Sequence, residues 1–169
     1  MGSGRYSPDD WVVYSSNTRT KTVASEVYRA RTVDDYLNPL KIKVRESRDS
    51  EANPASNAVI IALDQTGSMN TVLMNIVQKD LGIAFEEVHK RKPVSDPHIM
   101  LMTFDDVNAG VIDGCLQVSQ FEAEVNPLAQ QIDKFHLTNN GGSNNSESYH
   151  LPLYFAATKT SIRLLGKTG

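Results

Sequence analysis

One apolar segment constrains the fold of this chain more than any other feature. It covers residues 58–63, is rich in β-branched side chains, and is followed at once by Asp64. A short run of this composition predicts a β-strand that is buried on both faces, as in parallel sheets. Because open α/β sheets bind ligands at the carboxyl ends of their strands, Asp64 is the first candidate for a functional side chain.

The segments after this strand predict an α/β fold. Apolar side chains recur at three- and four-residue steps over residues 69–90, which is typical of an amphipathic helix. Two more strands are predicted over 98–104 and 116–121, joined by a hairpin turn at Asp113-Gly114, and two more helices over 122–135 and 147–165. This order favours an open, mainly parallel sheet with helices on both faces and residues 58–63 in its middle.

Residues 1–56 are predicted to form an N-terminal extension of the domain at 57–169. Apolar side chains at near-helical spacing predict one helix over residues 22–37, which Asn38-Pro39 should end. Residues 45–51 carry charges of both signs and are predicted to be a solvated linker. The extension either packs over its own domain or serves as a partner-binding arm, with aromatic anchors at Trp11, Tyr14 and Tyr28.

Composition excludes several classes of function. The 169 residues are 40% hydrophobic, which suits one domain with a sizeable core. Seventeen Lys and Arg residues against twenty Asp and Glu give a net charge of −3, without the basic stripe of a nucleic-acid-binding protein. The single cysteine, Cys115, excludes an internal disulfide framework. No apolar run is long enough to span a bilayer and no signal peptide is apparent, so we expect a cytoplasmic location.

The loop after the first strand offers a set of oxygen ligands. Thr66 and Ser68 follow Asp64 at alternate positions, so one tight turn can direct all three oxygen groups to a common point. A hard cation such as Mg²⁺ takes few carboxylates, neutral oxygens and retained waters. The structural alternative is a helix N-cap, in which the hydroxyl of Thr66 or Ser68 accepts a hydrogen bond from a backbone N–H group. That alternative does not explain why a carboxylate ends the strand.

The stretch Asp64-Gln65-Thr66-Gly67-Ser68-Met69, which closes an apolar strand and opens a helix, resembles the first loop of von Willebrand factor A domains. In that family a D-x-S/T-x-S loop forms the metal-ion-dependent adhesion site, together with a Thr from a second loop and an Asp from a third. The resemblance implies the first-loop ligands Asp64, Thr66 and Ser68. Ser143, in the Gly-rich segment 139–144, stands where the family has the second-loop Thr, and Asn144 and Ser146 are alternatives.

The resemblance also implies a fold, a function and a partner. The fold is the Rossmann-like three-layer von Willebrand factor A fold over residues 57–169. The function is non-enzymatic and metal-dependent protein–protein interaction, in which Mg²⁺ or Mn²⁺ receives its last ligand from an acidic residue of the partner. Intracellular bacterial and phage relatives suggest an AAA+ ATPase as a partner of this kind.

The third-loop Asp of the family has no counterpart after Ser143, where one helix and a short tail are predicted. We therefore expect a C-terminally incomplete domain, whose first strand presents an unpaired edge that invites another chain. Metal binding by the chain alone should then be weak, and a complementary segment or second subunit should stabilise it.

Two other functions are compatible with the sequence. The loop is similar to the D-K-T-G-T phosphorylation loop of haloacid-dehalogenase-like proteins, in which the Asp is the nucleophile; Gln65 replaces the Lys, and no G-D-x-x-x-D loop follows. The other function is that of a structural assembly protein with a degenerate metal loop. Asp105-Asp106, after the second strand, is interpreted as a polar strand exit rather than as an acid–base pair.

Overall fold

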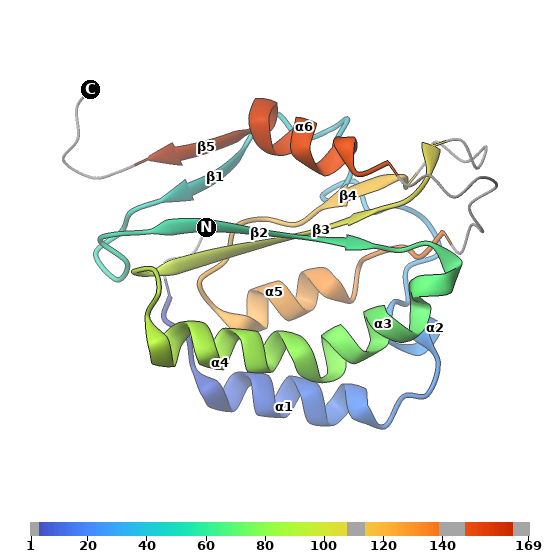
Figure 1. The fold of residues 1–169 in the computed structure, drawn as a ribbon, viewed down its shortest axis with the longest axis horizontal. Helices are drawn as coiled ribbons and strands as arrows, with labels where there is room; N and C mark the ends of the chain where they lie inside the picture. Colours follow the sequence, from blue (N-terminus) through green and yellow to red (C-terminus); the bar gives the residue numbers. More distant parts are fainter. Residues whose placement is uncertain (1–3, 108–113, 139–147, 164–169) are drawn as a thin grey trace.

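A computed structural model describes residues 4–107, 114–138 and 148–163, with the backbone alone described at Ser68 and Asn70. The chain has a mixed α/β fold with two sheets, each containing a parallel pair of strands (Figure 1). The larger sheet has the strand order β2-β3-β4, namely β2 (Asn57–Asp64), β3 (Pro97–Phe104) and β4 (Leu116–Val118). The smaller sheet consists of β1 (Arg45–Arg48) and β5 (Thr160–Arg163).

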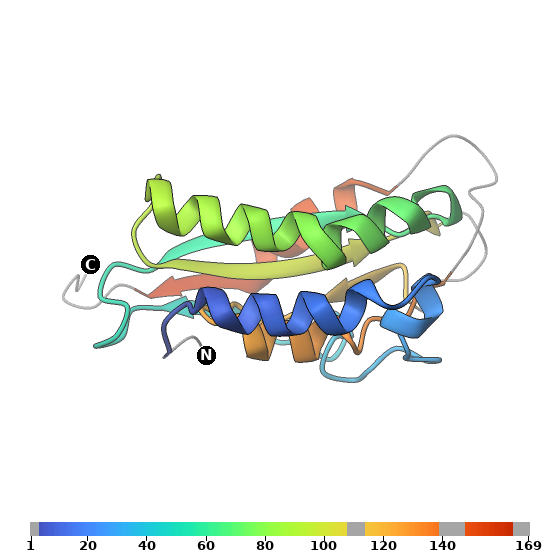
Figure 2. The same cartoon turned by 90° about the horizontal axis from the view of Figure 1, so that it is seen from below.

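Within the larger sheet, β2 and β3 are parallel and β3 and β4 are antiparallel. The first pair is joined by a long helical crossover, as a parallel pair requires. One face of this sheet is covered by α1 (Pro8–Arg19), α4 (Leu81–Arg91) and α5 (Val125–Ile132), with α1 packed against α4 and α5 (Figures 1 and 2). The other face carries α6 (His150–Lys159) and the β1–β5 pair.

The predicted helix after the first strand is confirmed. A 3₁₀ turn, η1 (Gly67–Met69), leads into α3 (Asn70–Asn75), a π-helical turn, η2 (Ile76–Asp80), and α4. The helix ends as expected before Pro93. Lys92 takes the left-handed conformation with φ 47°, and its N–H group donates to the carbonyl of Val88, which is a common way to close a helix.

The core follows the alternation of side chains along β3, all of whose residues are buried. Ile99 and Leu101 point into a cluster with the helices α1, α4 and α5. Met100, Met102 and Phe104 point to the opposite face, where Phe155 of α6 covers them. The two-sided burial expected of a parallel strand is therefore met by β3.

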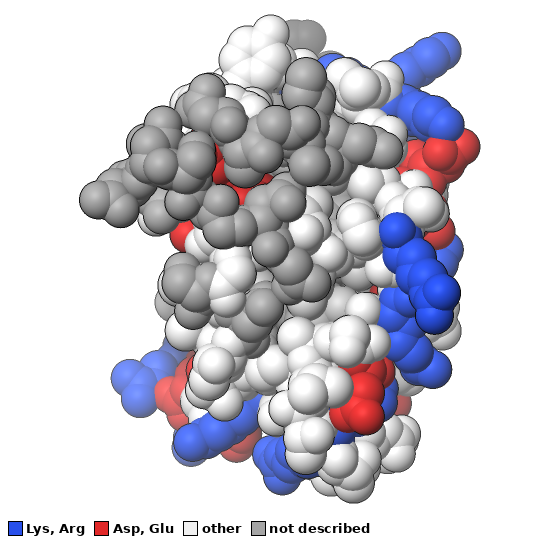
Figure 3. All heavy atoms as spheres, turned by 90° about the vertical axis from the view of Figure 1, so that its right-hand side faces the viewer, with Lys and Arg blue, Asp and Glu red and all other residues white. Residues whose placement is uncertain are grey.

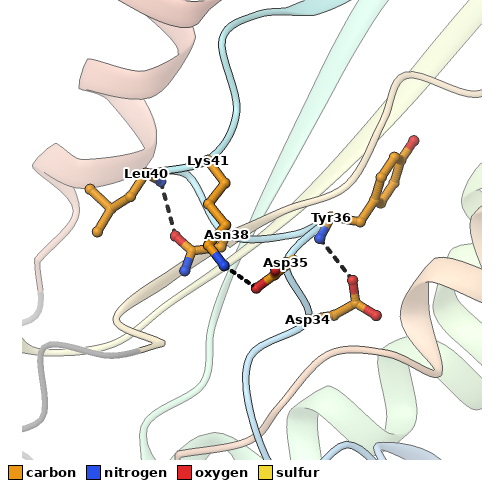
Figure 4. Close-up of polar contacts among 6 residues, drawn as sticks. All are labelled: Asp34, Asp35, Tyr36, Asn38, Leu40 and Lys41. Carbon is orange, nitrogen blue, oxygen red and sulfur yellow. Dashed lines mark hydrogen bonds and ion pairs between the residues drawn. The ribbon is translucent and has the colours of Figure 1, made fainter.

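The structure corrects the prediction for the N-terminal region. The helix predicted over residues 22–37 is wrong, because the long helix is α1 and only the four-residue α2 (Ala24–Val27) lies inside that range. The remainder is irregular apart from a turn at its end, where the backbone N–H of Tyr36 donates to Asp34 Oδ1 at 2.8 Å (Figure 4). A second turn follows, in which the backbone N–H of Leu40 donates to Asn38 Oδ1 at 3.0 Å. Such Asx turns compete with the helical hydrogen bonds.

The N-terminal region packs over its own domain. Trp11 is buried and lies with its ring centroid 6.0 Å from that of Phe85 in α4. The indole fits because Gly82 of α4 has no Cβ, since an added Cβ would lie 1.6 Å from Trp11 Nε1. Tyr28 is buried as well, and its hydroxyl donates to the carbonyl of Leu73 at 3.2 Å.

Three other predicted elements differ from the structure. Residues 45–48 are not a linker but strand β1, and the helix predicted to reach residue 165 ends at Lys159, where β5 begins. The strand over residues 58–63 is not central, because β2 pairs only with β3 among the described residues and so forms an edge of the larger sheet. It is also only partly buried, with Ile60 37% exposed. Each error concerns a pairing between segments distant in sequence, which local patterns do not encode.

The predicted third strand is shorter than expected, since β4 ends at Val118. It does pair with β3 in antiparallel fashion, with Leu116 opposite Phe104. Of the turn predicted between them, Asp113 lies outside the described residues, whereas Gly114 has φ +90°, a conformation that favours glycine. Among the helices in the described ranges, none is long and apolar enough to cross a lipid bilayer.

A buried histidine is expected to make the stability depend on pH. His98 of β3 is 1% exposed, with Nδ1 3.1 Å from Ser47 Oγ of β1. Burial lowers the pKa of His98 below its ordinary value of 6.5, although Asp96 and Asp49 act in the opposite direction. The ring is therefore neutral in the folded protein at a pH where the unfolded chain already binds a proton. The free energy of unfolding should fall as the pH is lowered from 7.5 through about 6.5 towards the folded-state pKa.

Two variants can identify the group that causes this pH dependence, when their free energy of unfolding is measured by urea denaturation at several pH values. His98→Asn should lose less stability than the wild-type chain as the pH falls below ~6.5. Each unit by which folding lowers the pKa of the histidine corresponds to ~1.4 kcal/mol of unfolding free energy. His150→Gln, at an exposed position, should keep the wild-type dependence. An unchanged pH profile in His98→Asn would show that another group is responsible.

Candidate functional site

The parallel pairing of β2 and β3 brings two strand ends to one edge of the sheet. Asp64 is in register with Phe104, and the N–H of Gln65 donates to the carbonyl of Phe104 at 2.9 Å. Asp105 follows Phe104 directly, so acidic side chains leave both strands at the same end. Figure 3 faces this end of the molecule and shows acidic atoms there. This is the carboxyl edge, where α/β sheets bind ligands.

The carboxylate of Asp64 organises the loop that follows it. Its Oδ1 accepts a hydrogen bond from the N–H of Thr66 at 2.8 Å, and the carbonyl of Thr66 accepts one from Met69 at 2.7 Å. This is an Asx turn followed by a 3₁₀ turn. The residue at the N-cap of α3 is Met69, which has no side-chain capping bond. The N-cap alternative for Thr66 and Ser68 stays a prediction, because the side chain of Ser68 lies outside the described residues.

Beneath the loop lies a buried pair of amides from Gln65 and Gln117, both 0% exposed. Gln65 Nε2 donates to the carbonyl of Gly114 at 2.8 Å, and Gln117 Nε2 approaches Gln65 Oε1 at 3.4 Å. The Gln117 amide also donates to the carbonyl of His136 at 2.7 Å and accepts from its N–H at 2.9 Å. The amide pair thus ties the loop after β2 to β4 and to the segment after α5.

Sequence reasoning missed this amide pair, although one signal was present. Val59, Ile61 and Leu63 point towards the helical core on one face of β2. Continuing the two-residue alternation past the strand places Gln65 on that same inward face. A polar side chain at an inward position needs a buried hydrogen-bond partner, which is the role that Gln117 and Gly114 fill.

The paired carboxylates after β3 are buried rather than a solvent-facing strand exit, since Asp105 and Asp106 are both 0% exposed. Asp105 Oδ1 accepts from the N–H of Asp106 at 2.7 Å, and Asp105 Oδ2 accepts a hydrogen bond from the hydroxyl of Thr138. The N–H of Val107 then donates to Ser148 Oγ at 3.2 Å. These contacts fix the end of β3 against the segments that precede and follow residues 139–147.

Two of the four predicted metal ligands can be compared with the structure. Asp64 and Thr66 are adjacent at the sheet edge, with Asp64 half-buried and Thr66 buried. The side chain of Ser68 and the whole of Ser143 lie outside the described residues, as do Asn144 and Ser146. The structure therefore joins the first-loop carboxylate to the first-loop threonine, and leaves the two serines as predictions.

The oxygen atoms of the side chains at this edge suit a cation that is bound by few charged ligands. Within the described ranges, no three His, Cys, Asp or Glu side chains lie close enough together to hold a metal ion. Asp64 and the Asp105-Asp106 pair thus share an edge without forming a carboxylate cage. A single carboxylate with hydroxyls fits Mg²⁺, which keeps several waters. Because a carboxylate has about four lone-pair sites, its bond to Thr66 leaves Asp64 able to coordinate a cation.

Two hollows can be compared with the position of this loop. One, of about 630 Å³, is at the amino end of β3 and is lined by both cationic and acidic side chains, among them Arg5, Lys92 and Asp96. The other, of about 460 Å³, lies between α6 and the loop around Pro39, and its lining is mainly apolar. Neither contains Asp64 or Thr66.

Comparisons with known proteins give no match. No protein-family model matches the chain, and neither the curated proteins nor the solved structures compared with it show a significant similarity.

Proposed function

We propose that this chain is a metal-dependent protein–protein interaction module of the von Willebrand factor A type. Asp64, Thr66 and Ser68, with Ser143 from a neighbouring loop, bind Mg²⁺ or Mn²⁺, and an acidic side chain of a partner protein completes the coordination. The finer fold proposed with it is the three-layer fold of that family. An AAA+ ATPase is the proposed class of partner.

The observation that carries the proposal is the position of Asp64. It ends a strand of a parallel pair at the carboxyl edge of the sheet, and its carboxylate closes the turn that contains Thr66. No ion pair between described residues involves Asp64. Buried amides below the loop supply a rigid support, which ligand sites require. A half-buried carboxylate without a cationic side chain beside it is well suited to a divalent cation.

The chemistry of the first coordination shell explains why a protein partner is proposed. Hydroxyl ligands contribute no negative charge, so a cation held by one carboxylate and hydroxyls remains electron-poor. Such an ion attracts a further carboxylate in place of one of its waters. An exposed Asp or Glu of another protein can supply that ligand, and removal of the cation should release the partner.

Cation binding can be tested with the metal alone, by isothermal titration calorimetry and by thermal unfolding. We expect Mg²⁺ and Mn²⁺ at millimolar concentrations to raise the melting temperature of the wild-type chain, because a ligand that binds only the folded state stabilises it. Asp64→Asn should abolish the rise while leaving the circular dichroism spectrum unchanged. The matched control is Asp80→Asn, which removes the same charge from an exposed position in η2. Equal responses of Asp64→Asn and wild type would refute the proposal.

A further inference from the structure

The larger of the two hollows, of about 630 Å³, is built mainly from three separate parts of the chain. These parts are residues 5–6 before α1, residues 52–55 before β2, and the segment that runs from the end of α4 to the start of β3. We call this hollow the amino-end cavity, because it lies where β3 begins. Its volume is within the range of pockets that bind small molecules, ~300–1,000 Å³.

The part of the cavity wall that carries Arg5 is held in place on both sides of this residue. The carbonyl of Gly4 accepts a hydrogen bond from Nδ2 of Asn53 at 2.9 Å, and Asn53 is only 5% exposed. The ring of Tyr6 is stacked on that of His89 in α4, with the ring centroids 3.9 Å apart. Arg5 therefore extends from a backbone that is anchored to two other segments of the wall.

The acidic part of the wall is held in place as well. Asp96 Oδ2 accepts a hydrogen bond from the N–H of Ala55 at 3.0 Å, and the backbone carbonyl of Asp96 accepts one from the N–H of Asn57 at 3.1 Å. A carboxylate has about four lone-pair sites, so Asp96 can still accept hydrogen bonds from a ligand. Lys92, at the other end of the same loop, also lines the cavity.

The opposite charges that line the cavity do not pair with each other. No ion pair between described residues joins Asp96 to Arg5 or to Lys92, although all three side chains line the same hollow. A ligand that is only an anion would meet the carboxylate of Asp96, and a ligand that is only a cation would meet the two cationic side chains. A small molecule with one charge of each sign can pair with both.

We propose that the amino-end cavity binds a zwitterionic small molecule of the α-amino acid class. The carboxylate of the ligand pairs with the side chains of Arg5 and Lys92, and its ammonium group pairs with Asp96. The carbonyl groups at the C-terminal end of α4 favour positive charge too. The stacked rings of Tyr6 and His89 offer an apolar surface to the side chain of the ligand. Asp64 does not line this cavity, so the inference is independent of the proposed cation site.

Three ligands of similar shape test the proposal by isothermal titration calorimetry. L-Phenylalanine carries both charges, 3-phenylpropionate lacks the ammonium group, and 2-phenylethylamine lacks the carboxylate. The wild-type chain should bind L-phenylalanine at least ~10-fold more tightly than either of the other two, because hydrogen bonds between charged groups are lost with each deletion. No binding of L-phenylalanine at millimolar concentrations, or equal affinity for all three ligands, would overturn the inference.

Two variants should change this selectivity in opposite ways. Asp96→Asn removes the negative charge but keeps an oxygen for the N–H of Ala55, and Asn tolerates the positive φ of 35°. It should lose affinity for L-phenylalanine and gain affinity for 3-phenylpropionate. Lys92→Asn, at a residue with φ 47°, should lose affinity for L-phenylalanine and gain affinity for 2-phenylethylamine. The ligand that each variant still binds also shows that the variant is folded.

The matched control is Lys90→Gln, which removes a positive charge from an exposed position of α4 outside the cavity wall. Its affinity for L-phenylalanine should equal that of the wild-type chain. The inference would be wrong if Asp96→Asn bound L-phenylalanine as tightly as the wild-type chain does. It would also be wrong if Lys90→Gln lost as much affinity as Lys92→Asn, because the effect would then come from the net charge of the surface.

Discussion

Replacement of Phe85 by Ala is expected to cost ~3–5 kcal/mol of unfolding free energy, the usual range for removing a buried aromatic ring. Phe85 is 1% exposed and joins α4 to α1 and to the segment that precedes α1. Its ring lies 6.0 Å from the rings of Trp11 in α1 and of Tyr6, stacked on both. Small domains have a total stability of ~5–15 kcal/mol, so the loss is a large fraction of the total. Urea denaturation monitored by tryptophan fluorescence measures it.

The same helix contains a matched control. Ile83 is 48% exposed, two residues from Phe85, and Ile83→Ala should change the stability by no more than ~0.5 kcal/mol. Phe85→Leu should fall between Phe85→Ala and wild type, because part of the buried volume is kept. If Phe85→Ala were as stable as Ile83→Ala, the packing of the N-terminal helix on α4 would be wrong.

The second large effect is expected at Gln117. Gln117→Met keeps the length of the side chain but removes its amide, so the N–H and C=O groups of His136 lose the bonds at 2.9 and 2.7 Å. A buried polar group left without a partner costs ~1–3 kcal/mol. The expected loss of unfolding free energy is therefore ~2–5 kcal/mol, measured by urea denaturation. Gln130→Met, at an exposed position of α5, should be close to neutral.

Gln117 and Gln65 are expected to act together. Gln65→Met alone removes the bond to the carbonyl of Gly114, and the double variant should lose less than the sum of the two single variants, because residues in one hydrogen-bond network couple. Both variants should also weaken any thermal shift caused by Mg²⁺, since Gln65 lies between Asp64 and Thr66. Strict additivity of the two losses would show that the amides act separately.

The local sequence pattern correctly predicted those elements whose apolar residues directly indicate which faces are buried. β3 is a continuous apolar run and is buried on both faces. The helix from α3 to α4 has apolar side chains at three- and four-residue steps, and Leu73, Val77 and Leu81 among them are buried. The same patterns failed for residues 22–37, where Val27 and Leu37 are buried at helical spacing but are held by a short helix and turns. The spacing of apolar residues indicates which side chains are buried, whereas the Asx turns determine the backbone conformation here.

The candidate site was predicted in part. Asp64 and Thr66 were recognisable because a carboxylate directly after an apolar strand is unusual and the hydroxyl follows at the right spacing. The buried roles of Asp105 and Gln117 were not recognisable, because their partners Thr138 and His136 are 33 and 19 residues away. Hydrogen bonds over such separations depend on how the segments meet in the fold.

By itself, the sequence determined the mixed α/β class, the helix after the first strand and the loop chemistry at Asp64, because each depends on residues close together in the chain. Only the tertiary structure decided that β2 is an edge strand among the residues described, that β1 and β5 pair, and that buried amides support the loop. These features depend on which distant segments lie side by side. That choice follows from the joint burial of apolar surface and the satisfaction of backbone groups over the whole chain.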